Sequence, residues 1–136
     1  MMSSNLTTPE LQYKGHSSLG DLLRTLSYVP GAPSSALKDR AVKSFAKAAE
    51  ISLDLMSKPL NPDYRPSIIS RKEMTFYMYV KGANTGFENK DCASAKILAK
   101  KAIEFEKAMH SKDPSFVKLK GYLESLENIC KNCEEH

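Results

Sequence analysis

Apolar side chains recur at intervals of three and four residues along most of this chain, which is the spacing that gathers them on one face of an α-helix. The pattern is most regular between residues 37 and 56. The repeating positions there are Ala41, Phe45, Ala48, Ser52 and Leu55, with Val42, Ala49 and Met56 beside them. The sequence therefore predicts a helix over residues 37–56, with Phe45 at the centre of its buried face.

The segment KEMTFYMYVKGA, residues 72–83, has a dense group of aromatic side chains. The alternation expected of a β-strand fails at the neighbouring Tyr77 and Met78, whereas a helical spacing fits. The positions on that spacing are Ile69, Glu73, Phe76, Val80, Ala83 and Phe87. The proline-rich segment before Ser67 places the start of this helix near that residue. Because Tyr77 and Tyr79 lie off the predicted face, we expect the helix to be buried on more than one side.

Three further helices follow from the same spacing and from the residues that begin and end helices. The first begins after Ser18 and ends before Pro30. Its apolar positions are Leu19, Leu22, Leu23 and Leu26. Asp91 is a candidate N-cap for the second, and Asp113 with Pro114 begins the third. The apolar positions of these last two are Ala95, Leu98, Ala102, Phe105 and Met109, and then Phe116, Leu119, Leu123, Leu126, Cys130 and Cys133.

No segment of the sequence alternates like a strand, so the predicted fold class is all-α: an antiparallel helical bundle of four main helices plus a short N-terminal helix. A chain of 136 residues is long enough for one domain with its own core. We assign the mostly polar residues 1–16 to a disordered leader and residues 17–136 to a single helical bundle domain. The proline-rich residues 57–67 are predicted to form a loop.

Charge and composition restrict the classes of function. The 20 basic and 16 acidic residues give a formal charge of +4, but they are scattered, and nucleic-acid binding would need them clustered. No apolar run approaches the length of a transmembrane helix, and the N-terminus has neither a secretory nor a mitochondrial targeting pattern. A cytoplasmic location is therefore expected. The odd number of cysteines, three, indicates reduced thiols rather than a disulfide framework.

The segment CKNCEEH places Cys130, Cys133 and His136 at helical spacing, which leaves a metal site as an alternative. A structural zinc ion needs four ligands, usually from two separated pairs, and the sequence offers no fourth ligand at metal-like spacing. Both cysteines also fall on the apolar side of the last predicted helix, where a thiol packs as a small apolar group. We therefore predict no metal and no cofactor, with a cysteine-based metal-binding protein as the alternative.

The sequence contains no glycine-rich phosphate loop, nucleophile elbow or metalloprotease helix, so it predicts no catalytic site. A helical bundle without catalytic residues usually presents a groove to a peptide or to a helix of a partner protein. Tyrosines that lie off the core face, with a lysine beside them, suit such a groove. We therefore predict Tyr77, Tyr79 and Lys81 as binding residues for an apolar, acidic peptide or for the same surface of a second copy.

Three short segments, in this order, resemble the N-terminal helical module of UBPY-type ubiquitin-specific proteases. They are SSLGDLL at residues 17–23, AVKSFAKAAEIS at residues 41–52 and FYMYVKGA at residues 76–83. The residues that carry the resemblance are Ser17, Ser18, Leu19, Asp21 and Leu22, then Phe45, Ala48, Ala49 and Glu50, and then Tyr77, Met78, Tyr79, Val80, Lys81 and Ala83. A related module occurs in the metalloprotease AMSH.

The resemblance implies a variant of the microtubule-interacting and transport (MIT) bundle, which in its family docks tail helices of ESCRT-III subunits and, in UBPY-type proteins, also forms dimers. The chain is accordingly expected to be a non-catalytic interaction or dimerisation module of an endosomal deubiquitinase, or a small stand-alone adaptor or regulator of ubiquitin recycling. Its expected partners are ESCRT-type tail peptides, an adaptor, or a second copy in a homodimer. Any thiol-dependent protease activity would lie outside these residues.

Overall fold

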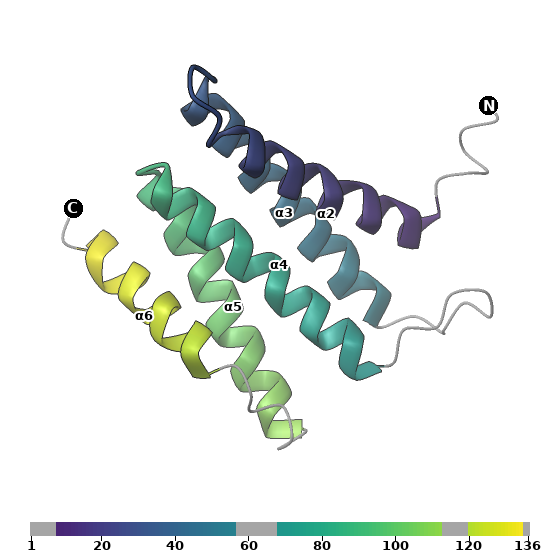
Figure 1. Cartoon of the computed structure of the whole chain (residues 1–136). Coiled ribbons are helices and arrows are strands. Elements are labelled where there is room, and N and C mark those ends of the chain that lie inside the picture. Colours follow the sequence, from purple (N-terminus) through teal and green to yellow (C-terminus); the bar gives the residue numbers. More distant parts are fainter. Residues whose placement is uncertain (1–7, 57–67, 113–119, 135–136) are drawn as a thin grey trace.

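The computed structural model describes residues 8–56, 68–112 and 120–134, and within these ranges the chain forms five α-helices and no strand (Figure 1). The helices are α2 (Pro9–Leu26), α3 (Ser34–Met56), α4 (Ile68–Glu88), α5 (Cys92–Lys112) and α6 (Lys120–Glu134). The predicted all-α class is therefore confirmed. The structure differs from the prediction in the length of the first helix, which is a full element of 18 residues rather than a short addition.

The helices are arranged in two layers. Each helix packs against the next one in the chain, and α4 also packs against α6. Figure 1 shows α2, α4 and α6 running in one direction, with α3 and α5 running back behind them. Consecutive helices are therefore antiparallel, and α4 lies in the middle of the front layer.

The start of α2 corrects the predicted boundary of the N-terminal leader. The helix begins at Pro9, so residues 9–16, which we assigned to the leader, are helical. Thr8 is the N-cap, and its side-chain oxygen accepts a hydrogen bond from the backbone N–H of Leu11. Pro9 is at the first helical position, where its missing N–H is not needed, and Glu10 is favourably placed near the positive end of the helix dipole. Ser18 is inside the helix and does not cap it.

The buried face of α2 is also different from the predicted one. Only Leu23 among the four predicted leucines is buried, at 4% exposed, whereas Leu22 is 54% exposed. The helix contacts the bundle through Tyr13, Gly20 and Leu23. A Cβ atom at Gly20 would lie 2.6 Å from a ring carbon of Phe45, so this position brings the helix backbone directly onto that ring.

The pairing of α3 with α4 agrees with the prediction. Phe45 and Phe76 are fully buried and belong to one core cluster, as expected from their central positions in the apolar pattern. A buried polar contact lies beside them, where the hydroxyls of Ser52 and Thr75 are 2.7 Å apart and hydrogen-bonded. The pairing satisfies both hydroxyls inside the core, which removes the cost of burying them alone. Phe87, which is also on the predicted face of α4, is exposed rather than part of the core.

The turn from α4 to α5 is tight. Lys90 has a positive φ of 59°, and the side chain of Asp91 accepts a hydrogen bond from the backbone N–H of Ser94. The prediction that Asp91 caps α5 is therefore confirmed. Gly86 allows the two helices to approach closely, since a Cβ there would be 3.2 Å from the backbone nitrogen of Ala95.

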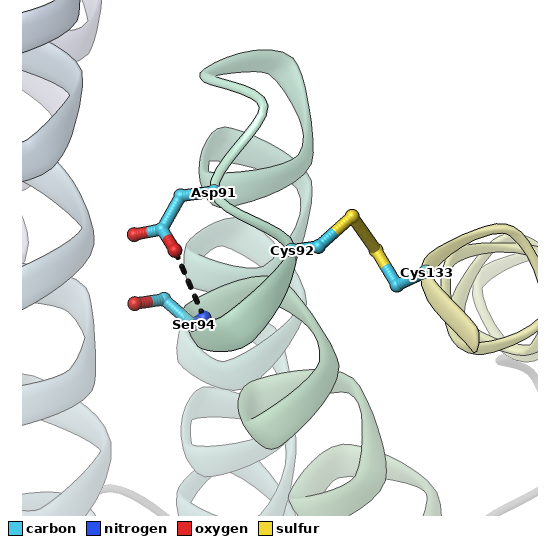
Figure 2. The surroundings of a disulfide bond; sticks show 4 residues. All are labelled: Asp91, Cys92, Ser94 and Cys133. Carbon is cyan, nitrogen blue, oxygen red and sulfur yellow. Dashed lines mark hydrogen bonds between the residues drawn. A yellow bond between two sulfur atoms is a disulfide. The ribbon is translucent and has the colours of Figure 1, made fainter. Parts of the chain in front are cut away.

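A disulfide bond joins the first residue of α5, Cys92, to Cys133 in the last turn of α6 (Figure 2). Their Cα atoms are 5.3 Å apart, within the usual range for a disulfide. The prediction of three reduced thiols is therefore wrong for two of them, and Cys130 remains as a thiol. The predicted cap at Asp113 and Pro114, with the apolar positions Phe116 and Leu119, lies outside the described residues. The same applies to the proline-rich loop and to His136.

Candidate functional site

An open groove of about 440 Å³ lies on the front layer, between α2, α4 and α6. Its lining residues are Tyr13, Ser17, Met74, Tyr77, Met78, Lys81 and Tyr122. This volume is within the range of sites that bind small ligands or the anchoring side chains of a peptide. We call this site the front groove.

The floor of the front groove comes from one face of α4. Met74, Tyr77, Met78 and Lys81 are spaced by three, one and three residues, which places them on neighbouring turns of one helical face. Met78 is buried, while Met74 and Tyr77 are half-buried. Methionine side chains are flexible and polarisable, so this floor can adapt to apolar groups of different shapes.

One wall of the groove is Tyr122 of α6, which remains 40% exposed. Its ring meets the ring of Tyr77 edge to face, with centroids 5.4 Å apart, and it meets Phe76 in the same manner at 6.4 Å. Burial raises the pKa of the Tyr77 hydroxyl, and the neighbouring Tyr122 and Glu73 raise it further. Tyr77 is therefore neutral near pH 7, and the pair of tyrosines presents both an aromatic surface and hydroxyl groups to a ligand.

The other side of the groove includes a cation. Lys81 Nζ lies 3.0 Å from Oδ1 of Asp21 on α2, and it also lies over the ring of Phe45, 5.7 Å from the centroid. Asp21 is exposed and does not line the groove. Lys81 is the one charged side chain among the lining residues, so the groove favours a ligand with a carboxylate next to an apolar segment.

The three predicted binding residues are not together. Tyr77 and Lys81 line the front groove, but Tyr79 is on another side of α4 and is 5% exposed. Its ring packs near that of Phe105 on α5, with centroids 6.4 Å apart. Burial, together with the charge of Glu50 on α3, raises the pKa of Tyr79. Tyr79 is therefore a core residue between α4 and the back layer, and it is not part of the groove.

Sequence reasoning missed Tyr13 and Tyr122, which complete the groove from α2 and α6. Tyr13 was placed in the leader, although the segment Thr8–Pro9–Glu10 has the signals of a helix start and should have extended α2 to include it. Tyr122 has no local signal, since only the packing of α6 against α4 brings it to Tyr77.

A second, smaller depression of about 200 Å³ lies between α3 and α5 on the back layer. Its lining residues are Val42, Lys43, Ala46, Ser94, Ile97, Leu98 and Lys101. Lys43 already forms an ion pair with Asp39. The front groove is larger and has aromatic walls, so it is the stronger candidate site.

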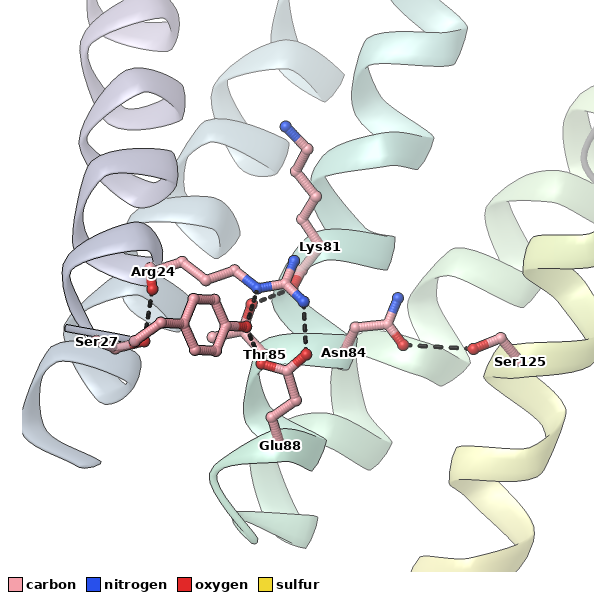
Figure 3. A network of polar contacts seen from close by, with 8 residues as sticks. Arg24, Ser27, Lys81, Asn84, Thr85, Glu88 and Ser125 are labelled. Carbon is pink, nitrogen blue, oxygen red and sulfur yellow. Dashed lines mark hydrogen bonds and ion pairs between the residues drawn. The ribbon is translucent and has the colours of Figure 1, made fainter. Parts of the chain in front are cut away.

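A polar network joins the C-terminal ends of α2 and α4 (Figure 3). Arg24 donates to Glu88 at 2.6 Å and to the hydroxyl of Tyr28, and Tyr28 donates to the other oxygen of Glu88. Burial alone would raise the pKa of Glu88, but the hydrogen bonds from Tyr28 and Arg24 and the nearby positive charges outweigh it, and the pKa is lowered. The network fixes α2 against α4 at one end of the front layer.

Across residues 8–56, 68–112 and 120–134, no three or more His, Cys, Asp and Glu side chains gather in a way that could hold a metal ion. None of the helices in these ranges combines the length and apolar content needed to cross a bilayer.

Comparison of the chain with models of protein families, with curated proteins and with solved structures finds no match.

Proposed function

We propose that this chain is a non-catalytic protein-interaction module that binds an apolar, acidic peptide in the front groove. The observation that carries the proposal is the groove itself, where Tyr13, Tyr77 and Tyr122 from three helices surround an adaptable methionine floor. Aromatic side chains of this kind are enriched at protein interfaces, because they offer a large rigid contact area and a hydroxyl group.

The chemistry of the partner follows from the lining. A segment with two or three apolar side chains on one face would fill the space above Met74 and Met78, as an amphipathic helix does in a groove between helices. An acidic side chain at its edge would meet Lys81, whose ion pair with Asp21 is exposed to solvent. The formal charge of +4 on the whole chain also favours an acidic partner over a basic one.

The resemblance of the segments at residues 17–23, 41–52 and 76–83 supports a more specific version of this proposal. In that version the partner is the tail helix of an ESCRT-III subunit. The chain then acts as the interaction module of an endosomal deubiquitinase, or as a stand-alone adaptor or regulator of ubiquitin recycling, and recruitment of the tail brings it to endosomes.

The proposal is tested by isothermal titration calorimetry, in which the full chain is titrated with an acidic amphipathic peptide from an ESCRT-III tail and the binding free energy is measured. Tyr77→Ala and Lys81→Gln should each weaken binding by roughly 1–3 kcal/mol. Lys101→Gln on the back layer and Phe87→Ala, at an exposed aromatic residue of α4 outside the groove, are the matched controls and should bind like wild type. Equal loss in the controls, or no loss in the groove variants, would place the binding surface elsewhere.

A second candidate function, self-association, is favoured by the outer face of α2. Leu11, Leu19, Leu22 and Leu26 are exposed on the side opposite the buried face, and the side of α2 that they share with Gly15, Ser18 and Thr25 has no charged residue. We call this face the leucine face. Four exposed leucines on one helix are an unusual apolar surface for a monomer and are typical of an interface.

A second copy is the occupant that fits the leucine face, because the face is complementary to itself. In an antiparallel pair with a two-fold axis near Ser18 and Leu19, Leu22 of one copy meets Gly15 of the other, and Leu11 meets Leu26. Gly15 has open space above it that can receive a leucine side chain.

Sedimentation equilibrium separates this dimer from peptide binding in the groove. Leu22→Asp should shift the chain to monomer while peptide binding remains unchanged. Leu53→Asp, at another exposed leucine, on α3, is the control and should leave the mass unaltered. A wild-type chain that sediments as a monomer at high micromolar concentration would contradict self-association.

A further inference from the structure

Three cysteines lie at one corner of the molecule. Cys92 and Cys133 are bonded to each other, and Cys130 is three residues before Cys133 on the same helix. Residues three apart on a helix are neighbours on its surface, so Cys130 and Cys133 lie on adjacent turns of one face of α6. Cys130 is half-buried and packs against the core cluster, whereas Cys133 is buried.

We propose that Cys92, Cys130 and Cys133 form a thiol–disulfide exchange site in which Cys130 is the attacking thiol, and that the state of this site controls whether α6 closes the front groove. The first part of the proposal is about sulfur chemistry and stands alone. The second part rests on the proposed function, because it regulates the same groove.

The exchange needs no outside oxidant or reductant. The thiolate of Cys130 attacks Sγ of Cys133, a new sulfur–sulfur bond forms between these two residues, and the bond from Cys133 to Cys92 breaks. The electron pair of the broken bond leaves on Sγ of Cys92, which takes up the proton that Cys130 gave to solvent. One disulfide and one thiol are present before and after the step, so nothing is oxidised or reduced overall.

The helix end limits how readily this exchange occurs. The Cβ atoms of residues three apart on a regular helix are about 5–6 Å apart, whereas a disulfide needs about 3.5–4.5 Å. The last turn of α6 must therefore open for the new bond to form. Cys133 is already in that last turn, with Glu134 as the final helical residue, and helix ends fray more easily than helix centres. Exchange is thus coupled to unwinding at the end of α6.

The attachment of α6 explains why the bond matters for the groove. The buried side chains of α6 include Leu126, Ile129 and Cys133. The hydrogen bond from Ser125 to Asn84 on α4 is long, at 3.4 Å (Figure 3). A helix of 15 residues is marginal by itself in water, so its docking depends on its contacts with α4 and α5 and on the bond to α5.

Release of Cys92 removes the covalent part of that attachment. The docking equilibrium of α6 then shifts toward the undocked state, and Tyr122 leaves its place against Tyr77. The front groove loses one wall, and a peptide that contacts Tyr122 is released. The bonded state of Cys92 and Cys133 is therefore the binding-competent state.

The chemistry is tested on the full chain by acid quench, alkylation of free thiols and peptide mass mapping without reduction. In wild type at pH 8 we expect the Cys130–Cys133 bond beside the Cys92–Cys133 bond, with alkylated Cys92 appearing in step. Cys130→Ser should show only the native bond, and glutathione should release its Cys92 at least about threefold more slowly, since an internal thiol competes at millimolar effective concentration. A wild type with only the native bond and a release rate equal to that of Cys130→Ser would overturn the exchange site.

The effect on the groove has a separate readout. The chain has six tyrosines and no tryptophan, so its near-ultraviolet circular dichroism reports largely on tyrosine packing. Reduced wild type and Cys92→Ser should lose the part of this signal that comes from the Tyr77–Tyr122 contact, and oxidised Cys130→Ser should keep it. An unchanged signal after reduction would overturn the control of α6.

Peptide titration distinguishes failure of this inference from failure of the proposed function. If the acidic peptide binds the oxidised chain at least about tenfold more tightly than the reduced chain, both are supported. Binding of equal strength in both states overturns the regulation and leaves the proposed function in place. No binding in either state overturns the proposed function, while mass mapping still decides the exchange site.

Discussion

Helices α2 and α4 have similar apolar spacing along the sequence, yet α4 buries most of its predicted apolar face and α2 exposes most of its own. Helix α4 packs against α3, α5 and α6, and it buries Phe76 and Val80 on the predicted face. Helix α2 has its main contact with α3 and turns most of its leucines outward. The buried residues of α2 are instead Glu10, Tyr13, Gly20 and Leu23. Gly20 is the residue at the contact with Phe45.

The difference shows that apolar spacing identifies a helix more reliably than it identifies the buried face. A central helix has neighbours on several sides, so almost any apolar stripe will be covered. An edge helix has one packed side, and there the shape of the neighbour decides. The ring of Phe45 requires the α2 backbone to come close, and a glycine position allows this where a leucine would not.

The largest expected effect on stability is at Phe45, the α3 residue that contacts both α2 and α4. Phe45 is fully buried, touches α2 at Gly20 and lies under Lys81 of α4. Phe45→Ala should lower the free energy of unfolding by about 3–5 kcal/mol, because it leaves a cavity between three helices. Urea denaturation followed by helical circular dichroism measures this. A variant as stable as wild type would mean that this contact is misplaced.

Leu22 and Leu23 are adjacent on α2, and substitution of each tests which face of the helix is buried. Leu23→Ala should cost about 2–4 kcal/mol, since its side chain is in the core, whereas Leu22→Ala should change stability by less than about 0.5 kcal/mol. Both are measured by urea denaturation at low protein concentration, so that self-association does not contribute. Equal effects of the two changes would contradict the assignment of the outer face.

Gly20→Ala tests whether the close approach of α2 is required. Alanine favours the helix by about 1 kcal/mol over glycine, but its Cβ would overlap the buried ring of Phe45. Overpacking of a core usually costs about 1–3 kcal/mol, so after the helix gain a net loss of up to about 2 kcal/mol is expected. Gly15→Ala is the matched control, because nothing lies within 4 Å of its Cβ position, and it should be neutral or stabilising.

The smallest expected effect concerns the polar network between the ends of α2 and α4. Because the pKa of Glu88 is lowered in the folded state, its contribution is present above its ordinary value near 4.5 and is lost as the pH falls through the lowered pKa. The pair with Arg24 is partly exposed, so Glu88→Gln should cost under about 1 kcal/mol at pH 7. Urea denaturation should show a difference between Glu88→Gln and wild type at pH 7, and this difference should shrink as the pH falls below the ordinary pKa of the carboxyl group.

The parts of the fold that the sequence predicts are those determined within a helix. The stripes through Phe45, Phe76 and Phe105 and the cap at Asp91 agree with the structure, because a central helix buries its stripe and a cap acts within one turn. The start of α2 was also readable from Thr8 and Pro9, but the polar composition of the first residues was given too much weight.

The parts that the sequence does not predict depend on contacts between helices. Tyr77 and Lys81 share a face of α4 because they are four residues apart, whereas Tyr79, two residues from each, lies on another side of the helix and is buried. The bond between Cys92 and Cys133 was also missed, because the spacing of cysteines gives no information on which chain segments meet.

The disulfide between Cys92 and Cys133 closes a covalent loop and leaves the rest of the chain outside it. The two cysteines are separated by 41 positions, and closing a loop of this size lowers the entropy of the unfolded chain by an amount worth about 4 kcal/mol. The loop contains α5 and nearly all of α6, whereas α2, α3 and α4 are outside it. Amide hydrogens in α2, an edge helix outside the loop, should therefore exchange with solvent first, and those in α5 last. Reduction of the bond should bring α6 from the protected group to the early-exchanging group.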